Sequence, residues 1–187
     1  LVQEYGVSRV GVAQTPGEFE RREVAHLARK LPVPLQQHGG NTLFEHRQLS
    51  ERMPRLPRHY TPFRREAENI APLAPIAEPD LAPPPPGLRA PDVVLSATRP
   101  HPAFVARGGA DAAVQRLQTW MFRERAIDHY DRTRNELEGL FFSSGLSPWL
   151  ANGALSVRRV AEQLGAYERR HGASNASRHL YLELLWR

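Results

Sequence analysis

Residues 143–150 read Ser143-Ser144-Gly145-Leu146-Ser147-Pro148-Trp149-Leu150, three hydroxyl side chains around a glycine, followed by a proline and an apolar run. Hydroxyls and turn amides in such a segment are suited to holding a phosphate at the start of a helix. The simpler interpretation of the residues alone is a helix N-cap, with Ser147 as the cap and Pro148 at the first helical position. The segment lacks the last glycine of a nucleophile elbow, which argues against a serine hydrolase.

Apolar residues at helical spacing flank this segment on both sides. Before it, Val114, Leu117 and Met121 form an i, i+3, i+7 stripe. After it, Ser156 and Gly172 are typical of the cap and the end of a helix, and another helix begins near residues 174–177. Residues 104–187 are therefore predicted to form an all-α domain fragment.

The N-terminal residues have a different pattern. Residues 7–13 form a short apolar run suited to a buried strand, residues 18–31 carry a loose helical stripe ended by Pro32, and residues 33–38 can form a second strand. Strand, helix and strand predict a parallel pair joined by a right-handed crossover, part of an open α/β sheet. We expect an α/β fragment, a partial doubly wound parallel sheet that is too small to be stable by itself.

Proline dominates the chain from Ala71 to about Pro102, with four in a row at residues 83–86. Proline fixes φ and removes amide donors, so this stretch predicts an extended linker. The expected organisation is an α/β domain over 1–70, a proline-rich linker over 71–103 and a helical domain over 104–187.

The composition favours a polyanionic partner. The chain has 187 residues, a formal charge of +5 and a pI near 10.2, and Lys30 is its only lysine. Arginine binds phosphate oxygens bidentately, although a GC-rich genome explains heavy arginine use more simply. The basic positions between Arg52 and Arg65 are interrupted by Pro54 and Pro57, so a solvated loop is the preferred interpretation there.

Several classes of protein are excluded or disfavoured. The chain has no cysteine, which excludes disulfides and thiolate zinc sites, and its eight histidines show no zincin-type pairing, so no metal is expected. No apolar run reaches the length of a membrane span. The first residues, Leu1 to Gly6, lack both a Met and the layout of a signal peptide. Both ends of the sequence look cut.

Three blocks in fixed order resemble the FAD-binding helical domain of the cryptochrome and DNA photolyase family. They are Tyr130-x-x-x-Arg134, the serine segment 143–150, and Glu183-Leu184-Leu185-Trp186-Arg187. The resemblance implies cofactor contacts from the first two blocks and from the last residue, with Gly145 in the variable slot: Tyr130, Ser143, Ser144, Gly145, Leu146, Ser147 and Arg187. It also implies that Glu183 and Trp186 face a pyrimidine dimer as catalytic and DNA-binding residues, and that Arg134 contacts the DNA backbone.

The residue types of the last block suit those roles. The Glu183 carboxyl would hydrogen-bond a pyrimidine carbonyl and stabilise the radical anion formed when reduced flavin donates an electron. The Trp186 indole would form an apolar wall beside a base taken out of the stack. The plainer alternatives are a core stripe of Trp186 with Leu182 and Leu185, and a surface pair of His179 with Glu183.

The first half carries a weaker resemblance. Tyr60-Thr61-Pro62-Phe63-Arg64-Arg65 is similar to the family's Phe-Thr-Pro-Phe-Arg segment, and residues 42–44 occupy the position of a short strand before it. Thr133-Arg134-Asn135 and the Ser-Ser pair resemble the DASH branch. In that branch an antenna folate (methenyltetrahydrofolate) often lies between the domains, and Glu20 falls near an antenna contact; a solvated helix face is the alternative for Glu20.

The expected function is that of a DASH-type photolyase or cryptochrome fragment. It lacks the family's opening strand and the part that follows the third block, including further flavin contacts. The intact protein would be a deoxyribodipyrimidine photo-lyase that binds FAD and splits cyclobutane pyrimidine dimers with blue light, acting on single-stranded or damaged duplex DNA. The alternatives are a signalling cryptochrome, a flavin-free nucleic-acid binder and an inactive gene remnant. A cytoplasmic location is expected, and the oligomeric state is left open.

Overall fold

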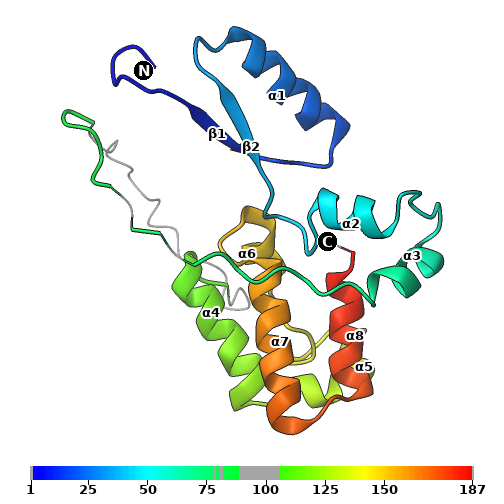
Figure 1. Cartoon of the computed structure of the whole chain (residues 1–187). Coiled ribbons are helices and arrows are strands. Elements are labelled where there is room, and N and C mark those ends of the chain that lie inside the picture. The colour runs from blue at the N-terminus through cyan, green and yellow to red at the C-terminus, as the bar shows by residue number, and fades with distance from the viewer. Residues whose placement is uncertain (1, 78, 81, 89–105, 187) are drawn as a thin grey trace. The chain divides into compact units, whose positions relative to one another are not determined.

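The computed structural model of the chain describes residues 2–77, 79–80, 82–88 and 106–186 (Figure 1). The fold divides into two compact units. One comprises residues 1–12, 16–38 and 76–105, and the other comprises residues 13–15, 39–75 and 106–187. The predicted domain boundaries at 70/71 and 103/104 stay a prediction. Residues 39–75 fold with the C-terminal helices in the second unit, which we call the helical unit.

The first unit, which we call the strand unit, contains a strand, a helix and a strand. β1 (Val10–Ala13) and β2 (Leu35–His38) form a two-stranded parallel sheet, and α1 (Glu18–Lys30) connects them (Figure 1). The Val10 amide donates to the Pro34 carbonyl at 3.0 Å, next to the paired strands. Acidic residues lie in the first turn of α1 and basic residues in its last turn, which complements the helix dipole. The predicted α/β element order is confirmed.

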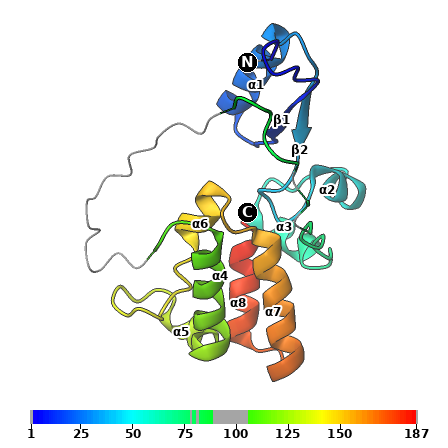
Figure 2. The same ribbon diagram turned by 90° about the vertical axis from the view of Figure 1, so that its left-hand side faces the viewer.

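The helical unit is built around three helices that run side by side, α4 (Ala110–Gln118), α7 (Val157–His171) and α8 (Asn175–Leu184) (Figures 1 and 2). α4 continues into a π-helical turn at Thr119–Arg123, and a 3-10 turn at Ala126–His129 leads into α5 (Tyr130–Thr133). The shorter helices are α2 (His46–Arg52), α3 (Tyr60–Ala67) and α6 (Ser147–Asn152). This arrangement confirms the predicted all-α character of the C-terminal part.

The apolar stripes read from the sequence form the core of this unit. α7 begins at the predicted cap, where the Ser156 hydroxyl accepts a hydrogen bond from the Arg158 amide, and ends before Gly172. The largest fully buried apolar side chains come from six parts of the unit: Leu43, Leu117, Trp120, Met121, Ile127, Leu146, Val157, Val160 and Tyr167. A hydrogen bond of 2.8 Å from the Gln118 amide to the Gln163 side chain also joins α4 to α7.

Between residues 42 and 65, one local prediction is wrong and another holds only in part. Residues 42–44 form bends where a strand was expected, and Leu43 and Phe44 are buried there. Arg52 ends α2, and Arg64 and Arg65 lie in α3, whereas Arg55 and Arg58 lie exposed in the connection between these helices, where a solvated loop was expected. Pro54 and Pro57 lie between the two helices and Pro62 lies in the first turn of α3, positions where proline interrupts no helical hydrogen bond.

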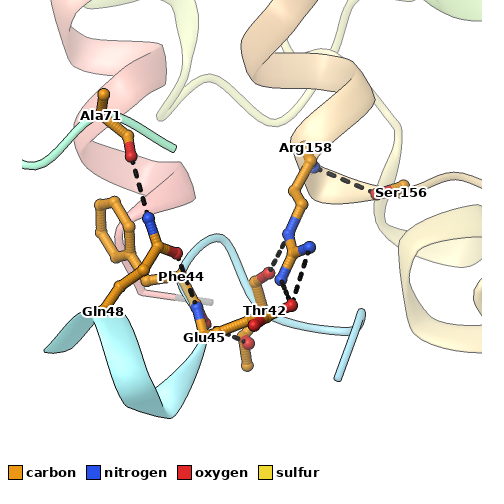
Figure 3. Close-up of polar contacts among 7 residues, drawn as sticks. All are labelled: Thr42, Phe44, Glu45, Gln48, Ala71, Ser156 and Arg158. Atoms are coloured by element: carbon orange, nitrogen blue, oxygen red, sulfur yellow. Dashed lines mark hydrogen bonds and ion pairs between the residues drawn. The ribbon is translucent and has the colours of Figure 1, made fainter. Parts of the chain in front are cut away.

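Arg158 attaches this segment to α7 (Figure 3). Its side chain is only 4% exposed, its Nε donates to the Thr42 carbonyl at 3.2 Å, and its guanidinium is 3.5 Å from the Glu45 carboxylate. Glu45 in turn caps α2, and the Gln48 side chain donates to the Ala71 carbonyl at 3.2 Å. A buried arginine is stable only when paired and hydrogen-bonded, so these contacts hold residues 42–71 against the helical core.

The described part of the predicted linker, residues 71–77, 79–80 and 82–88, contains neither helix nor strand. None of the helices in the described residues combines the length and the apolar character that crossing a membrane requires.

Candidate functional site

Arg116 holds the serine segment from α4. Its guanidinium donates to three carbonyls of the turn, to Ser144 at 2.9 Å, to Leu140 at 2.7 Å and to Ser143 at 3.2 Å. Gly145 has a φ of +64° and lies against this guanidinium, since a Cβ added there would be 3.3 Å from the nearest Arg116 nitrogen. Burial lowers the pKa of Arg116, but an arginine side chain stays charged at neutral pH. The turn therefore has a fixed positive charge directly beside it.

The turn carries three serine hydroxyls. Within the described part of the chain, the hydroxyls of Ser143, Ser144 and Ser147 make no hydrogen bond, and the three residues are exposed or half-buried. Leu146 between them is 2% exposed and anchors the segment in the core. α6 begins at Ser147 with Pro148 in its first turn, one residue earlier than predicted; Leu146 occupies the cap position, so Ser147 is not the predicted N-cap.

Tyr130 lies at the start of α5, beside the same turn. Its ring packs edge-on against Trp120, with centroids 5.5 Å apart, and Trp120 donates its indole N–H to the Phe141 carbonyl at 2.9 Å. Thr133 of α5 donates to the Phe142 carbonyl at 2.8 Å. Burial, followed by the charge of Glu183, raises the pKa of Tyr130. The tyrosine and the serine segment thus share one supporting network.

The end of α8 meets α5 at an ion pair. Arg134 follows α5 directly, and its guanidinium pairs with the Glu183 carboxylate; the two side chains are 30% and 42% exposed. The predicted alternative pairing of Glu183 with His179 is therefore not the arrangement found. The Arg134 amide donates to the Tyr130 carbonyl at 3.1 Å, so Tyr130, Arg134 and Glu183 form one cluster.

Trp186 lies just beyond α8 and is not a core residue. Its side chain is 67% exposed, whereas Leu185 before it is buried. The indole stacks on the ring of Tyr60, with centroids 3.8 Å apart and planes 12° from parallel. The plainer alternative of a core stripe is therefore wrong for Trp186. Arg187 lies outside the described residues.

Sequence reasoning missed the side chains that support this site. Arg116 lies within the predicted stripe of α4, and nothing in its spacing distinguishes it from a surface arginine. Tyr60 was noted only as the first residue of a motif. Their roles rest on contacts that span 24–28 residues for Arg116 and 122 residues for Tyr60, which periodicity does not detect.

A separate hollow of about 820 Å³ lies elsewhere on the helical unit. Residues 72–75 line one side of it, and residues of α7 and α8, including Arg158, Arg178 and Tyr181, line the other. None of the predicted site residues lines this hollow. It is therefore distinct from the cluster around Tyr130 and Glu183.

Comparison with known proteins decides the family. The DNA photolyase family model matches residues 1–85. Cryptochrome DASH of Xenopus laevis is 35% identical over 169 residues, which cover 84% of this chain and 32% of the relative. Cryptochrome DASH of Vibrio parahaemolyticus is 35% identical over 152 residues, covering 81% of this chain and 34% of the relative. The chain belongs to the cryptochrome and DNA photolyase family.

Solved structures of the family agree with this assignment. The crystal structure of a Synechocystis sp. cryptochrome superimposes with a TM-score of 0.78 at 26% identity and covers 99% of this chain and 41% of its own. A bacterial class III photolyase from Agrobacterium tumefaciens superimposes with a TM-score of 0.69 at 25% identity, covering 99% of this chain and 40% of its own. The chain spans about a third to two fifths of the length of these relatives.

The residues of the serine turn fit the cofactor that this family generally binds, FAD. The pyrophosphate of a dinucleotide needs hydrogen-bond donors and positive charge in its surroundings. The turn offers three hydroxyls without protein partners among the described residues, a glycine in the left-handed region and the Arg116 guanidinium behind it. The donor set is therefore of the right chemistry.

Proposed function

We propose that this chain supplies part of the FAD-binding and lesion-binding site of a DASH-type photolyase or cryptochrome, which acts on cyclobutane pyrimidine dimers in DNA. One observation carries the proposal. Tyr130, Arg134 and Glu183, predicted from two separate motifs, come together where α5 meets α8, and Arg134 and Glu183 are 49 residues apart in sequence. A common cluster is what a shared site requires.

In this proposal the first two blocks hold the cofactor. The Tyr130 hydroxyl and those of Ser143, Ser144 and Ser147 donate to the pyrophosphate, and Gly145 and the buried Leu146 keep the turn in place. Arg116 contributes its positive charge but no hydrogen bond to the cofactor, because its guanidinium donates to carbonyls of the turn. Arg187 stays a prediction as a further flavin contact. When bound, FAD supplies the light-driven electron transfer to the dimer.

The third block and Arg134 face the DNA in this proposal. An ionised carboxylate only accepts hydrogen bonds, so Glu183 paired with Arg134 would accept from a pyrimidine N–H. Donation from Glu183 to a pyrimidine carbonyl would need a proton on its carboxyl. Trp186 offers an exposed indole to a base removed from the stack.

The cofactor role is tested by titrating FAD with this chain and with the same chain joined to the C-terminal part of the Xenopus laevis relative. We expect quenching of flavin fluorescence by the hybrid and weaker quenching by the chain alone. Ser143→Ala combined with Ser147→Ala should weaken binding by about a hundredfold or more, because each hydrogen bond to a charged group contributes about 1.5–3 kcal/mol. The control is Ser50→Ala on the exposed face of α2. Equal affinity for both variants contradicts the proposed cofactor site.

The reaction is tested by illuminating the hybrid with single-stranded and duplex oligonucleotides that carry one dimer. Light-dependent loss of the dimer supports repair. Flavin binding without repair on either substrate replaces the repair proposal with a signalling cryptochrome. DNA binding that depends strongly on salt, without any flavin binding, supports the arginine-rich nucleic-acid binder instead.

Two finer predictions are carried forward as part of the proposal. Glu20 lies exposed in the first turn of α1, where an antenna folate contact was predicted and where a solvated helix face remains the simpler interpretation. A cytoplasmic location also stays a prediction.

A further inference from the structure

Tyr60 makes two contacts with the end of α8. It is the first residue of α3, its ring stacks on Trp186, and its hydroxyl donates to the Leu182 carbonyl at 2.9 Å. These contacts join two parts of the helical unit that are more than 120 residues apart in sequence. The functional proposal so far gives Tyr60 no role.

The hydrogen bond satisfies a carbonyl that the helix itself leaves open. The last carbonyls of a helix have no partner in the following turn. At the end of α8 the Leu185 amide donates to Tyr181 and the Trp186 amide donates to Glu183, so the Leu182 carbonyl receives the Tyr60 hydroxyl. Burial, followed by the charge of Glu183, raises the pKa of Tyr60, which keeps this phenol protonated and able to donate at neutral pH.

The stack fixes the plane of the indole. Parallel rings with centroids 3.8 Å apart are in full contact, so rotation of Trp186 away from this orientation loses the contact with Tyr60. Phe63 on the same helix has its centroid 6.4 Å from that of Tyr60 and a tilted ring, so it borders the stack without being part of it. Trp186 nevertheless stays 67% exposed. Tyr60 thus holds the indole in place, and most of the indole surface stays accessible to a further partner.

We propose that Tyr60 is a positioning residue that orients Trp186 as a preformed stacking platform for a pyrimidine base. A side chain fixed in its bound orientation binds more tightly because less rotamer freedom is lost on binding. The inference rests on the proposed function, in which Trp186 meets a base of damaged DNA. The two are separable, because the orientation of Trp186 is measurable without DNA.

The first experiment uses acrylamide quenching of tryptophan fluorescence in the full chain. Trp120 and Trp149 are 0% and 3% exposed, so quenching at low acrylamide reports Trp186. Tyr60→Leu should raise the quenching constant by about twofold, because it uncovers the second ring face. Tyr60→Phe keeps the ring and should match the parent chain. Phe63→Leu is the control for a ring lost from the same helix.

The second experiment measures binding of a single-stranded thymidine oligonucleotide carrying one cyclobutane dimer, with the same variants. Trp186→Ala should weaken binding about tenfold, because stacking on an aromatic side chain contributes about 1–3 kcal/mol per base. Tyr60→Leu should weaken it about threefold, within the range of an aromatic pair. Tyr60→Phe should lose less than about twofold. If far-UV circular dichroism shows that Tyr60→Leu is unfolded, Tyr60→Met takes its place, since it fills the volume without a planar face.

The outcomes separate the two proposals. The lesion-binding role of Trp186 is overturned if Trp186→Ala binds as tightly as the parent, or if neither the parent chain nor the hybrid binds. In that case the quenching comparison still decides whether Tyr60 stacks on Trp186. Weaker binding in Trp186→Ala with parent-like quenching and binding in Tyr60→Leu overturns the positioning role of Tyr60. The expected result is a higher quenching constant and weaker binding in Tyr60→Leu, with parent-like quenching and binding in Tyr60→Phe.

Discussion

The strand unit and the helical unit differ in where their apolar side chains lie. Among the described residues, every buried apolar side chain lies between residues 43 and 185, and α1 has no buried residue at all. Phe19 on α1 is 73% exposed, whereas Trp120 after α4 is fully buried. Both segments have helical periodicity, so a stripe predicts a helix without predicting that the helix has a partner to cover it.

The comparison is tested most strongly by truncating one aromatic residue in each unit. Trp120→Ala should lower the free energy of unfolding by about 3–5 kcal/mol, because it opens a cavity and removes the donor to the Phe141 carbonyl. Phe19→Ala should change it by less than about 0.5 kcal/mol, as expected for an exposed side chain. Urea denaturation followed by circular dichroism and tryptophan fluorescence measures both. Similar losses for both variants would show that α1 is buried in solution.

Two neighbouring arginines on α7 test what attaches residues 42–71 to the helical unit. Arg158→Ala should cost about 2 kcal/mol, because it leaves the Thr42 carbonyl without its donor and removes a buried charge from Glu45. Arg159 is 47% exposed and, among the residues that the structure describes, pairs only with Glu162 one turn away, so Arg159→Ala should cost at most about 0.5 kcal/mol.

Hydrogen exchange shows whether the effect of Arg158 is local. The amides of residues 42–48 should exchange faster in Arg158→Ala than in Arg159→Ala, because only Arg158 contacts this segment (Figure 3). Equal exchange in the two variants would mean that apolar packing of Leu43 and Phe44 suffices to hold the segment.

Ion pairs in the two units provide a finer comparison. In the helical unit Arg134 and Glu183 are 30% and 42% exposed, while in α1 Arg22 and Glu18 are 76% and 65% exposed. Double-mutant cycles with glutamine should give a coupling of about 1 kcal/mol for the first pair and about 0.3 kcal/mol for the second. Added salt should weaken the Arg22 pair more, because exposed charges are screened more strongly. A larger coupling for the Arg22 pair contradicts this ranking.

Within the helical unit, the elements that the sequence predicted well are those whose apolar stripe is buried by neighbouring helices. α7 is an example, because Val157, Val160 and Leu164 lie on one face and all three are buried. α2 and α3 were missed because they are short and flanked by prolines, and tertiary contacts from Arg158 and Tyr60 support them. Propensity summed over seven or eight residues is too weak to predict such helices.

The sequence predicted some residues of the candidate site and missed others. Motif order placed Tyr130, Arg134 and Glu183 in one site, and the structure brings these three together. The apolar pattern around Trp186 indicated a core position, but the residue is exposed, since periodicity assigns a face without showing what covers it. Arg116 carries no signal at all, because an arginine that binds carbonyls of a distant turn has the same local pattern as a solvated one.

The smallest expected effect concerns the alkaline pH dependence of the helical unit. Its four tyrosines, Tyr60, Tyr130, Tyr167 and Tyr181, all have a pKa raised by burial above the ordinary value of 10.0. Above pH 10 the unfolded chain therefore loses phenol protons that the folded chain keeps, so the contribution of these tyrosines to stability is constant below about pH 10 and falls as the pH rises further. Tyr130→Phe should make this fall shallower while changing the free energy of unfolding at pH 7 by no more than about 0.5 kcal/mol, because the hydroxyl makes no hydrogen bond within the described residues. Urea denaturation between pH 8 and pH 11 measures the slope of the unfolding free energy against pH. An unchanged slope in Tyr130→Phe would show that Tyr130 ionises in the folded protein as readily as in the unfolded chain. That outcome would contradict its burial beside Trp120 and Glu183.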